Sequence, residues 1–156
     1  MSYFNERTKE LNLKLVYYGP GLAGKTSNLQ YAHSRTDPAH RGKLISVANE
    51  TERLLFFDFT PRSLATPDFT VRIWLYTIPG RVWFEASRKL ILAGVDGVIL
   101  VADSQWERMD ANVESLESLK TNLLERSLEL EKLPFVIQYN KRDLPNAAPV
   151  DQLSRA

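Results

Sequence analysis

The feature of this sequence that most restricts its fold is a glycine-rich stretch, GPGLAGKT, at residues 19–26. It matches the pattern G-x-x-x-x-G-K-[ST] in full, follows a β-prone run at residues 13–18 and opens a helix-compatible stretch at residues 25–34. Its glycines allow backbone turns that a side chain would block, so that successive N–H groups can face phosphate oxygens. The pattern therefore predicts a strand, a phosphate-binding loop and a helix whose N-terminus favours the anion.

The residues of this loop have separate expected tasks. Lys25 is expected to place its ammonium between the β- and γ-phosphates, and the Thr26 hydroxyl to ligate the Mg²⁺ that bridges them. A glycine turn that happens to precede Lys-Thr is the structural alternative. The predicted nucleotide-binding positions of the loop are Gly19, Gly21, Leu22, Ala23, Gly24, Lys25, Thr26 and Ser27.

The rest of the chain alternates strand-like and helix-like segments. Residues 54–59 and 70–77 read as an antiparallel pair of strands, and residues 98–102 and 135–139 as apolar strands covered on both faces. A long helix is predicted at about residues 107–131 from its apolar stripe at helical spacing. This order predicts a single α/β domain over residues 1–156, with three layers, a mostly parallel sheet and a ligand site at the carboxyl ends of its strands.

A polar tetrapeptide, NKRD at residues 140–143, follows the last predicted strand. The Asp143 carboxylate can accept two hydrogen bonds from the N1–H and amine of guanine, whereas adenine offers no matching donors. Asn140 can bond the purine edge or brace the loops, and the stem of Lys141 can cover the base. The tetrapeptide could alone be a simple strand-end turn, but after a full phosphate loop it favours GTP or GDP over ATP.

Composition excludes several other classes of function. The chain has no cysteine, which excludes disulfides, thiolate metal sites and thiol nucleophiles. Its formal charge of +1 gives no sign of a nucleic-acid partner. The first residues are polar and charged, without a secretory signal, a membrane span or a myristoylation glycine, so we expect a cytoplasmic protein without a membrane anchor.

The order of these motifs, with a T-x-P-G turn at residues 77–80, resembles the Ras superfamily, and the details resemble its bacterial branch, the MglA family of polarity and gliding-motility GTPases. The resemblance covers nearly the whole chain. It rests on YYGPGLAGKTSNL, ETERLLFFDF, LYTIPGRVWFEASRKLILAGVDGVILVADS and VIQYNKRDLP. It implies a Ras-like P-loop fold that binds GTP or GDP with Mg²⁺ and acts as a molecular switch.

The resemblance also assigns expected roles in the switch regions. Where most Ras-like proteins have the aspartate of Asp-x-x-Gly, this chain has Thr77, so Asp58 becomes the candidate for the magnesium carboxylate, with a role within the sheet as the alternative. The Gly80 N–H would contact the γ-phosphate. The first switch is expected in the connection at about residues 34–53.

Hydrolysis of GTP is expected to be slow. By resemblance, Arg53 would act as an arginine finger supplied by the same chain, with a surface ion pair as the alternative. Position 81 carries arginine where the family usually has a glutamine that orients water. A guanidinium only donates hydrogen bonds, so Arg81 cannot accept a proton from water, although it could stabilise phosphate charge.

The resemblance implies partners and a shortened C-terminus. It implies a Roadblock-type regulator such as MglB that recognises the GTP form, together with polarity or motility effectors. A complete Ras-like domain continues beyond the NKRD turn, so the last strand, the base-backing loop and the closing helix are expected to be missing. Two alternatives to a switch remain open: a guanine-nucleotide-binding scaffold that does not hydrolyse GTP, and an ATP-dependent P-loop enzyme.

Overall fold

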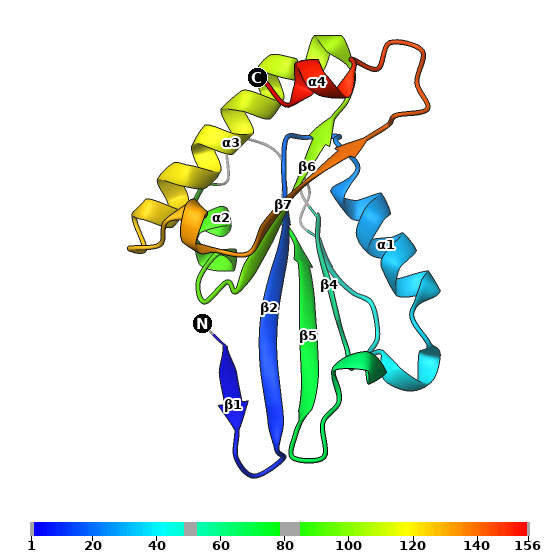
Figure 1. Cartoon of the computed structure of the whole chain (residues 1–156), viewed down its shortest axis with the longest axis vertical. Helices are drawn as coiled ribbons and strands as arrows, with labels where there is room; N and C mark the ends of the chain where they lie inside the picture. The colour runs from blue at the N-terminus through cyan, green and yellow to red at the C-terminus, as the bar shows by residue number, and fades with distance from the viewer. Residues whose placement is uncertain (1, 49–52, 79–84, 156) are drawn as a thin grey trace.

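A computed structural model describes residues 2–48, 53–78 and 85–155 of the chain. Strands and helices alternate along most of it (Figure 1). The strands are β1 (Tyr3–Asn5), β2 (Glu10–Tyr18), β3 (Ile45–Ala48), β4 (Arg53–Phe59), β5 (Thr70–Thr77), β6 (Gly97–Asp103) and β7 (Phe135–Asn140). The helices are α1 (Lys25–Arg35), α2 (Glu85–Ile91), α3 (Met109–Leu124) and α4 (Val150–Leu153).

The described strands form one mixed sheet in the order β3-β4-β5-β2-β6-β7, with β1 beside the first residues of β2. Strands β5, β2, β6 and β7 run parallel, which confirms the α/β class and brings their carboxyl ends to one edge. Strands β4 and β5 pair antiparallel, as predicted, with Phe56 opposite Tyr76. Since β4 runs against its neighbour, its first residues lie at this edge and its last residues lie far from it.

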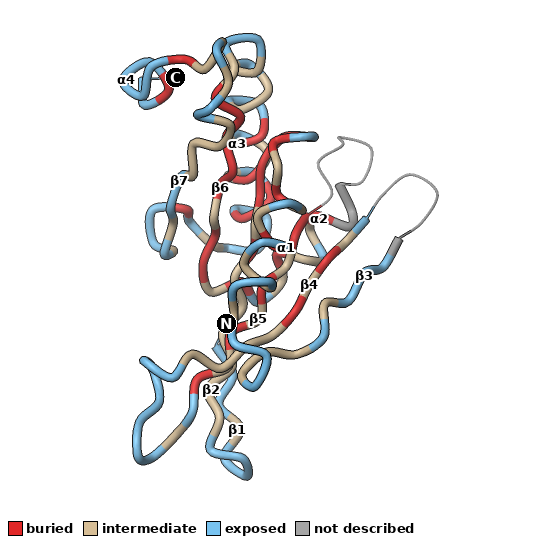
Figure 2. Tube along the Cα trace, turned by 90° about the vertical axis from the view of Figure 1, so that its right-hand side faces the viewer, coloured by how far each residue is buried: buried red, intermediate tan, exposed pale blue. Residues whose placement is uncertain are grey.

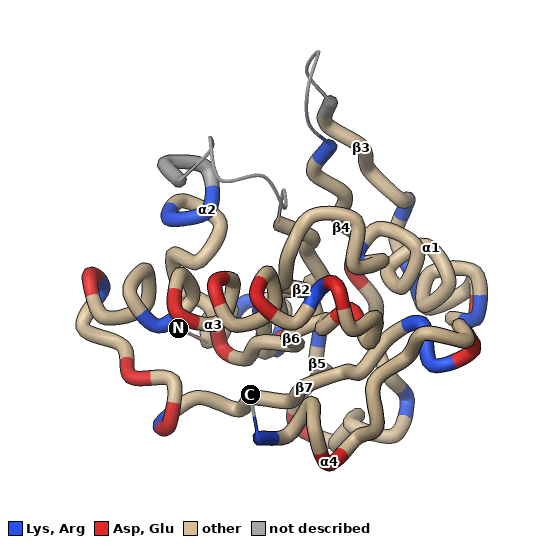
Figure 3. The backbone as a smooth tube through the Cα atoms, turned by 90° about the horizontal axis from the view of Figure 1, so that it is seen from above, with Lys and Arg blue, Asp and Glu red and all other residues tan. Residues whose placement is uncertain are grey.

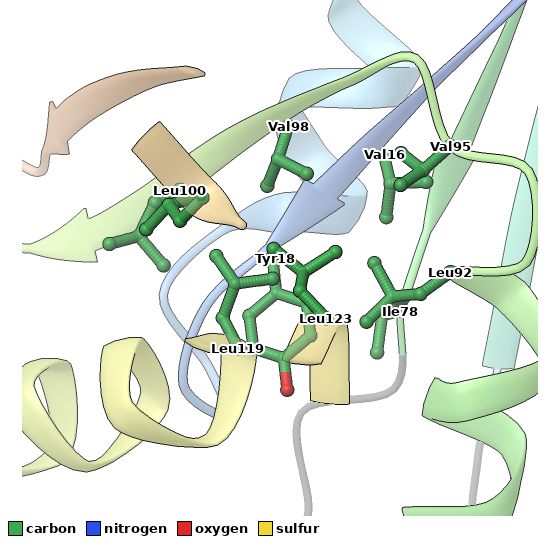
Figure 4. Close-up of a cluster of buried hydrophobic side chains, with 10 residues drawn as sticks. Val16, Tyr18, Ile78, Leu92, Val95, Val98, Leu100, Leu119 and Leu123 are labelled. Atoms are coloured by element: carbon green, nitrogen blue, oxygen red, sulfur yellow. The ribbon is translucent and has the colours of Figure 1, made fainter. Parts of the chain in front are cut away.

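Helices cover both faces of the sheet, and each face has its own apolar core. Helix α1 lies on one side, and α2 and α3 lie on the other (Figure 3). Leu29 of α1 packs into the first cluster with Leu55 and Phe57 of β4. In the second cluster, Leu119 of α3 lies near Tyr18, which ends β2 (Figure 4). Tyr18 directly precedes the glycine loop, so this core holds the loop's first residue in place.

Two apolar strands differ in burial although the sequence predicts both to be covered. Strand β6 is mostly buried and β7 is not (Figure 2). Every residue of β6 except Ile99 is buried, whereas Val136 and Ile137 of β7 are 57% and 43% exposed. The prediction of coverage is therefore confirmed for β6 and wrong for β7. The physical reason is position, because β6 lies between two strands and β7 pairs with β6 alone in the part of the chain described here.

The long helix predicted at residues 107–131 is shorter in the structure. Helix α3 ends at Leu124, and a single 3₁₀ turn follows at Leu130–Lys132. Ser127 has a left-handed backbone with φ of 58°, and the N–H groups of Ser127 and Leu128 donate to carbonyls of the last helical turn. This is a Schellman-type helix ending. It is hard to recognise in the sequence, because residues 125–129 contain no glycine.

Two strands lie where the sequence predicts none. Strand β1 forms a hairpin with β2, and β3 lies inside the connection expected to be the first switch. Both are short and mostly exposed in the described residues, so their hydrophobic patterns are weak. Among the described residues, no helix is both long enough and apolar enough to cross a bilayer.

Candidate nucleotide-binding site

The glycine loop joins β2 to α1 at the carboxyl edge of the sheet, as the sequence predicts. Gly19 and Gly24 have φ values of 140° and 102°, which side chains rarely tolerate. A Cβ atom on Gly19 would lie 2.3 Å from the backbone oxygen of Val101, and one on Gly24 would lie 2.2 Å from Nδ2 of Asn140. Glycine at these positions therefore permits close packing of the loop against two other segments of the edge.

Lys25 folds back over the loop that precedes it. Its Nζ donates hydrogen bonds of 2.8 Å to the Gly19 carbonyl and 2.7 Å to the Pro20 carbonyl, and the residue is only 7% exposed. Burial, and next the positive charge of Arg88, lower the pKa of Lys25 to about 8. An anion bound in the loop would raise the pKa of Lys25 again, because it favours the charged ammonium.

The other loop positions differ in accessibility. Thr26 is half-buried in the first turn of α1, and Ser27 beside it is exposed. Ala23 is buried, whereas Leu22 is 89% exposed with φ of 64°. The structure thus brings the predicted binding residues 19–27 together in one continuous loop and helix start.

The NKRD segment lies against this loop. The Asn140 side-chain amide donates a 2.7 Å hydrogen bond to the Ala23 carbonyl, so of its two predicted tasks the structure displays the bracing of the loops. A second hydrogen bond joins the same two parts of the chain: the Gln138 side-chain amide of β7 donates to Oδ1 of Asn28 in α1 at 2.6 Å. Asp143 follows in an exposed turn. A hydrogen bond therefore joins the predicted phosphate segment directly to the predicted base segment, although Ala23 and Asn140 are 117 residues apart.

Two residues at this edge are not found by the sequence reasoning. Asp103, the last residue of β6, is fully buried and forms an ion pair with Lys141. Arg108, just before α3, donates a hydrogen bond to the Gly21 carbonyl. The signal in the sequence is an acid that directly ends an apolar strand, since that position falls at the carboxyl edge of a parallel sheet.

Asp58, the predicted magnesium ligand, lies elsewhere. Its carboxylate pairs with Arg72, and it stands opposite Trp74 of β5. Trp74 pairs in turn with Lys14, so Asp58 lies roughly 16 Å down the strands from the glycine loop at about 3.3 Å per residue. The structure does not bring Asp58 and Thr26 together, and this placement gives the predicted magnesium role of Asp58 no support.

Thr77 has no carboxylate to offer a metal ion, and the described residues form no cluster of metal-ligating side chains. The Thr77 hydroxyl is buried, accepts from the Leu55 N–H at 3.0 Å and donates to the Leu55 carbonyl at 3.3 Å. Over residues 2–48, 53–78 and 85–155, no three His, Asp or Glu side chains gather as a cation site. Thr26 fits Mg²⁺ as one oxygen donor, and such an ion commonly takes most other ligands from nucleotide phosphates and water.

The predicted catalytic residues fall only partly within the described structure. Arg53 is exposed at the start of β4, on the edge that carries the glycine loop. Gly80 and Arg81 lie outside the described residues. Of the three, the structure therefore describes Arg53, which lies at the edge that carries the glycine loop.

A phosphate loop and a guanine-type segment held at the carboxyl edge of this α/β sheet define the Ras-like class of P-loop small GTPases. No model of a known protein family matches the chain. The chain is, however, 59% identical over 157 aligned positions to the mutual gliding-motility protein MglA of Myxococcus xanthus, across its whole length and 80% of that protein. The chain therefore belongs to the MglA family of small GTPases.

Proposed function

We propose that this chain is a guanine-nucleotide switch that binds GTP or GDP with Mg²⁺ and hydrolyses GTP slowly without a partner. The observation that carries the proposal is the hydrogen bond between the Asn140 side chain and the Ala23 carbonyl. It joins a phosphate-binding loop to a segment suited to guanine at a fixed spacing. Such pre-organisation is what a ligand with a base at one end and phosphates at the other requires.

Binding of the nucleotide divides between the two segments. The backbone of residues 19–24 and the helix start at Lys25 receive the phosphates, with Thr26 as the oxygen donor for Mg²⁺. The Lys25 ammonium would exchange its contacts with the Gly19 and Pro20 carbonyls for phosphate oxygens. Asp143 lies in an exposed turn, and its carboxylate can accept hydrogen bonds from the N1–H and the amine of guanine.

Hydrolysis would proceed by in-line attack of water on the γ-phosphorus, with GDP as the leaving group. Arg53 is our candidate for stabilising the developing charge on the phosphoryl oxygens, because it is exposed at the start of β4, on the edge that carries the glycine loop. Gly80 would contact the γ-phosphate through its N–H. Arg81 lacks the acceptor that orients water, and this supports a slow intrinsic rate.

The biological part of the proposal depends on the relative. The protein of Myxococcus xanthus is named for gliding motility, and we propose a role in motility or cell polarity for this chain as well. A Roadblock-type regulator similar to MglB and motility effectors would then be its partners. A cytoplasmic location belongs to the same proposal, since guanine nucleotides are metabolites of that compartment.

The experiment that tests base choice exchanges the base of the nucleotide. Asp143→Asn should weaken GDP binding by about a hundredfold or more and improve binding of xanthosine diphosphate, because xanthine offers a carbonyl where guanine has its amine. Affinities are measured by competition against fluorescent GDP. Equal loss for both nucleotides would assign Asp143 a structural role instead, and preferential binding of ADP by the wild type would support the ATP-dependent alternative.

A non-hydrolysing scaffold is the second candidate, and arginine at position 81 is the observation that favours it. Single-turnover cleavage of GTP separates the two functions. A switch should show measurable cleavage that falls about tenfold to a hundredfold in Arg53→Ala with little change in GTP affinity. A scaffold should show no cleavage in either protein.

A further inference from the structure

A fully buried carboxylate, Asp103, lies at the carboxyl end of β6, beside the glycine loop and the NKRD segment. Its backbone is held from both sides by Asn112 of α3. The Asp103 N–H donates to the Asn112 side chain at 2.9 Å, and the Asn112 amide donates to the Asp103 carbonyl at 2.8 Å. This double contact fixes the direction in which the carboxylate leaves the strand.

The two carboxylate oxygens share Gln105 as a partner and differ in their other contacts. Oδ1 accepts hydrogen bonds from the backbone N–H of Gln105 at 3.2 Å and from its side-chain amide at 3.0 Å. Oδ2 accepts a 2.6 Å hydrogen bond from Nζ of Lys141 and one of 3.2 Å from the Gln105 side-chain amide, and it lies 3.9 Å from Nε of Arg108. Gln105 therefore contacts both oxygens within the turn, and Oδ2 is also shared by two cations from separate segments.

Each of these cations belongs to a different part of the nucleotide site. Lys141 is the second residue of NKRD and has a left-handed backbone with φ of 62°, a conformation that costs energy outside glycine. Arg108 reaches the glycine loop, where its Nη2 donates a 2.8 Å hydrogen bond to the Gly21 carbonyl. The carboxylate thus connects the base segment with the phosphate loop through side chains.

We propose that Asp103 is a positioning residue for the guanine nucleotide, holding the base segment through Lys141 and the phosphate loop through Arg108. The inference rests on the proposed function, because it concerns the spacing of the two segments that would hold one ligand. An anchored ammonium keeps the methylene stem of Lys141 extended, and that stem is the part expected to cover the base. Asp103 itself touches no nucleotide in this arrangement.

Electrostatics support a permanently charged carboxylate. Burial alone would raise the pKa of Asp103, but hydrogen bonds from Lys141 and Gln105 outweigh it and hold the pKa below its ordinary value. A buried charge without partners would be costly, so the cations and the carboxylate depend on each other. Removing the charge should release both cations at once.

The test compares dissociation of fluorescent GDP from the wild type and from Asp103→Asn. We expect the dissociation rate to rise about tenfold or more, because loss of one partner of a buried charge pair acts mainly on dissociation. Asp96→Asn is the matched control, since Asp96 directly precedes the same strand at its far end and accepts a hydrogen bond from the Lys14 N–H. The control should stay within about twofold of the wild type.

Double variants distinguish positioning from a general structural role. If Asp103 acts through Lys141 and Arg108, adding Asp103→Asn to the Lys141→Met, Arg108→Met double variant should change the dissociation rate by less than about twofold. Multiplicative effects would overturn the proposal. So would a folded Asp103→Asn variant that releases GDP at the wild-type rate.

A single variant of Arg108 gives a second test of the same contacts. If Asp103→Asn does not fold, Arg108→Met alone should still accelerate GDP release severalfold, and an unchanged rate there would overturn the proposal. A wild-type protein that binds no guanine nucleotide would instead refute the proposed function. The two failures are therefore distinguishable.

Discussion

The two ends of the sheet each hold an aspartate at the end of an apolar strand, and the difference between their partners is instructive. Asp103 pairs with Lys141 and Arg108, which belong to connecting segments. Asp58 pairs with Arg72 of β5, which in turn lies 2.9 Å from the carboxylate of Glu10 at the start of β2. One carboxylate therefore joins loops to one another, whereas the other joins strands that backbone hydrogen bonds already hold.

A charge can control binding only where it sets the position of a segment that binds the ligand. At the carboxyl edge of a parallel sheet, loops and helix N-termini are not fixed by the strand ladder, so side-chain contacts set their spacing. At the opposite edge, the same type of ion pair adds only to the stability of strands whose register is already set. We expect substitutions at the two ends to separate nucleotide affinity from stability.

The largest contrast is expected between two glycines, Gly24 beside Asn140 and Gly42 beside Asp58. Gly24→Ala would force a Cβ to 2.2 Å from the Asn140 amide at a φ of 102°, so GDP release should accelerate about tenfold to a hundredfold. Gly42→Ala would place a Cβ 2.0 Å from Oδ1 of Asp58 and should lower the free energy of unfolding by about 1–3 kcal/mol.

Dissociation of fluorescent GDP and chemical denaturation, measured on both glycine variants, check this contrast. Release from Gly42→Ala should stay within about twofold of the wild type, because distant sites act independently. A similar acceleration in both variants would remove the distinction between the two ends of the sheet.

The fold could be predicted from the sequence where a pattern is local. The glycine loop, the antiparallel pair of β4 and β5 and the buried strand β6 all follow from residue type and spacing. The end of α3 could not be predicted, because Ser127 supplies the left-handed residue that glycine usually provides. Nor does an apolar sequence reveal that β7 lacks a neighbour on one side in the described sheet.

The candidate site shows the same division. Binding residues within one motif could be placed from the sequence, because the chain itself holds them together. Sequence reasoning does not find Asp103, because its partners come from two other segments that meet only through the packing of α3 and β7. The prediction of Asp58 as a magnesium ligand rests on the missing aspartate at position 77 and on an acid within an apolar strand, but the reversed direction of β4 carries Asp58 to the far end of the sheet.

A smaller effect is expected from the protonation of Lys25. Its pKa of about 8 lies below the ordinary value of 10.5, so the folded protein without nucleotide loses this proton before the unfolded chain does. Between these two values the unfolded chain binds more protons, and the stability of the free protein should rise with pH. Phosphate requires the charged ammonium, so GDP affinity should fall above pH 8, by at most about tenfold per pH unit.

Calorimetry in two buffers of different ionisation enthalpy measures this linkage. At pH 8.5 the wild type should take up about 0.75 proton per GDP bound if the bound ammonium stays charged. Lys25→Arg is the control, because its guanidinium does not titrate in this range. Equal proton uptake by both proteins would assign the proton to another group, including the base itself.

The smallest effect on nucleotide binding is expected from Asp58→Asn, at the far end of the sheet. Loss of the charge partner of Arg72 should lower the free energy of unfolding by about 1–2 kcal/mol, because the pair is only partly exposed. GDP release should change by less than about twofold, both in Mg²⁺ and after its chelation, since the carboxylate lies far from the glycine loop. A magnesium ligand would behave differently: Asp58→Asn would then release GDP in Mg²⁺ as fast as the wild type does in chelator. That single result would restore Asp58 to the nucleotide site and make the far end of the sheet part of it.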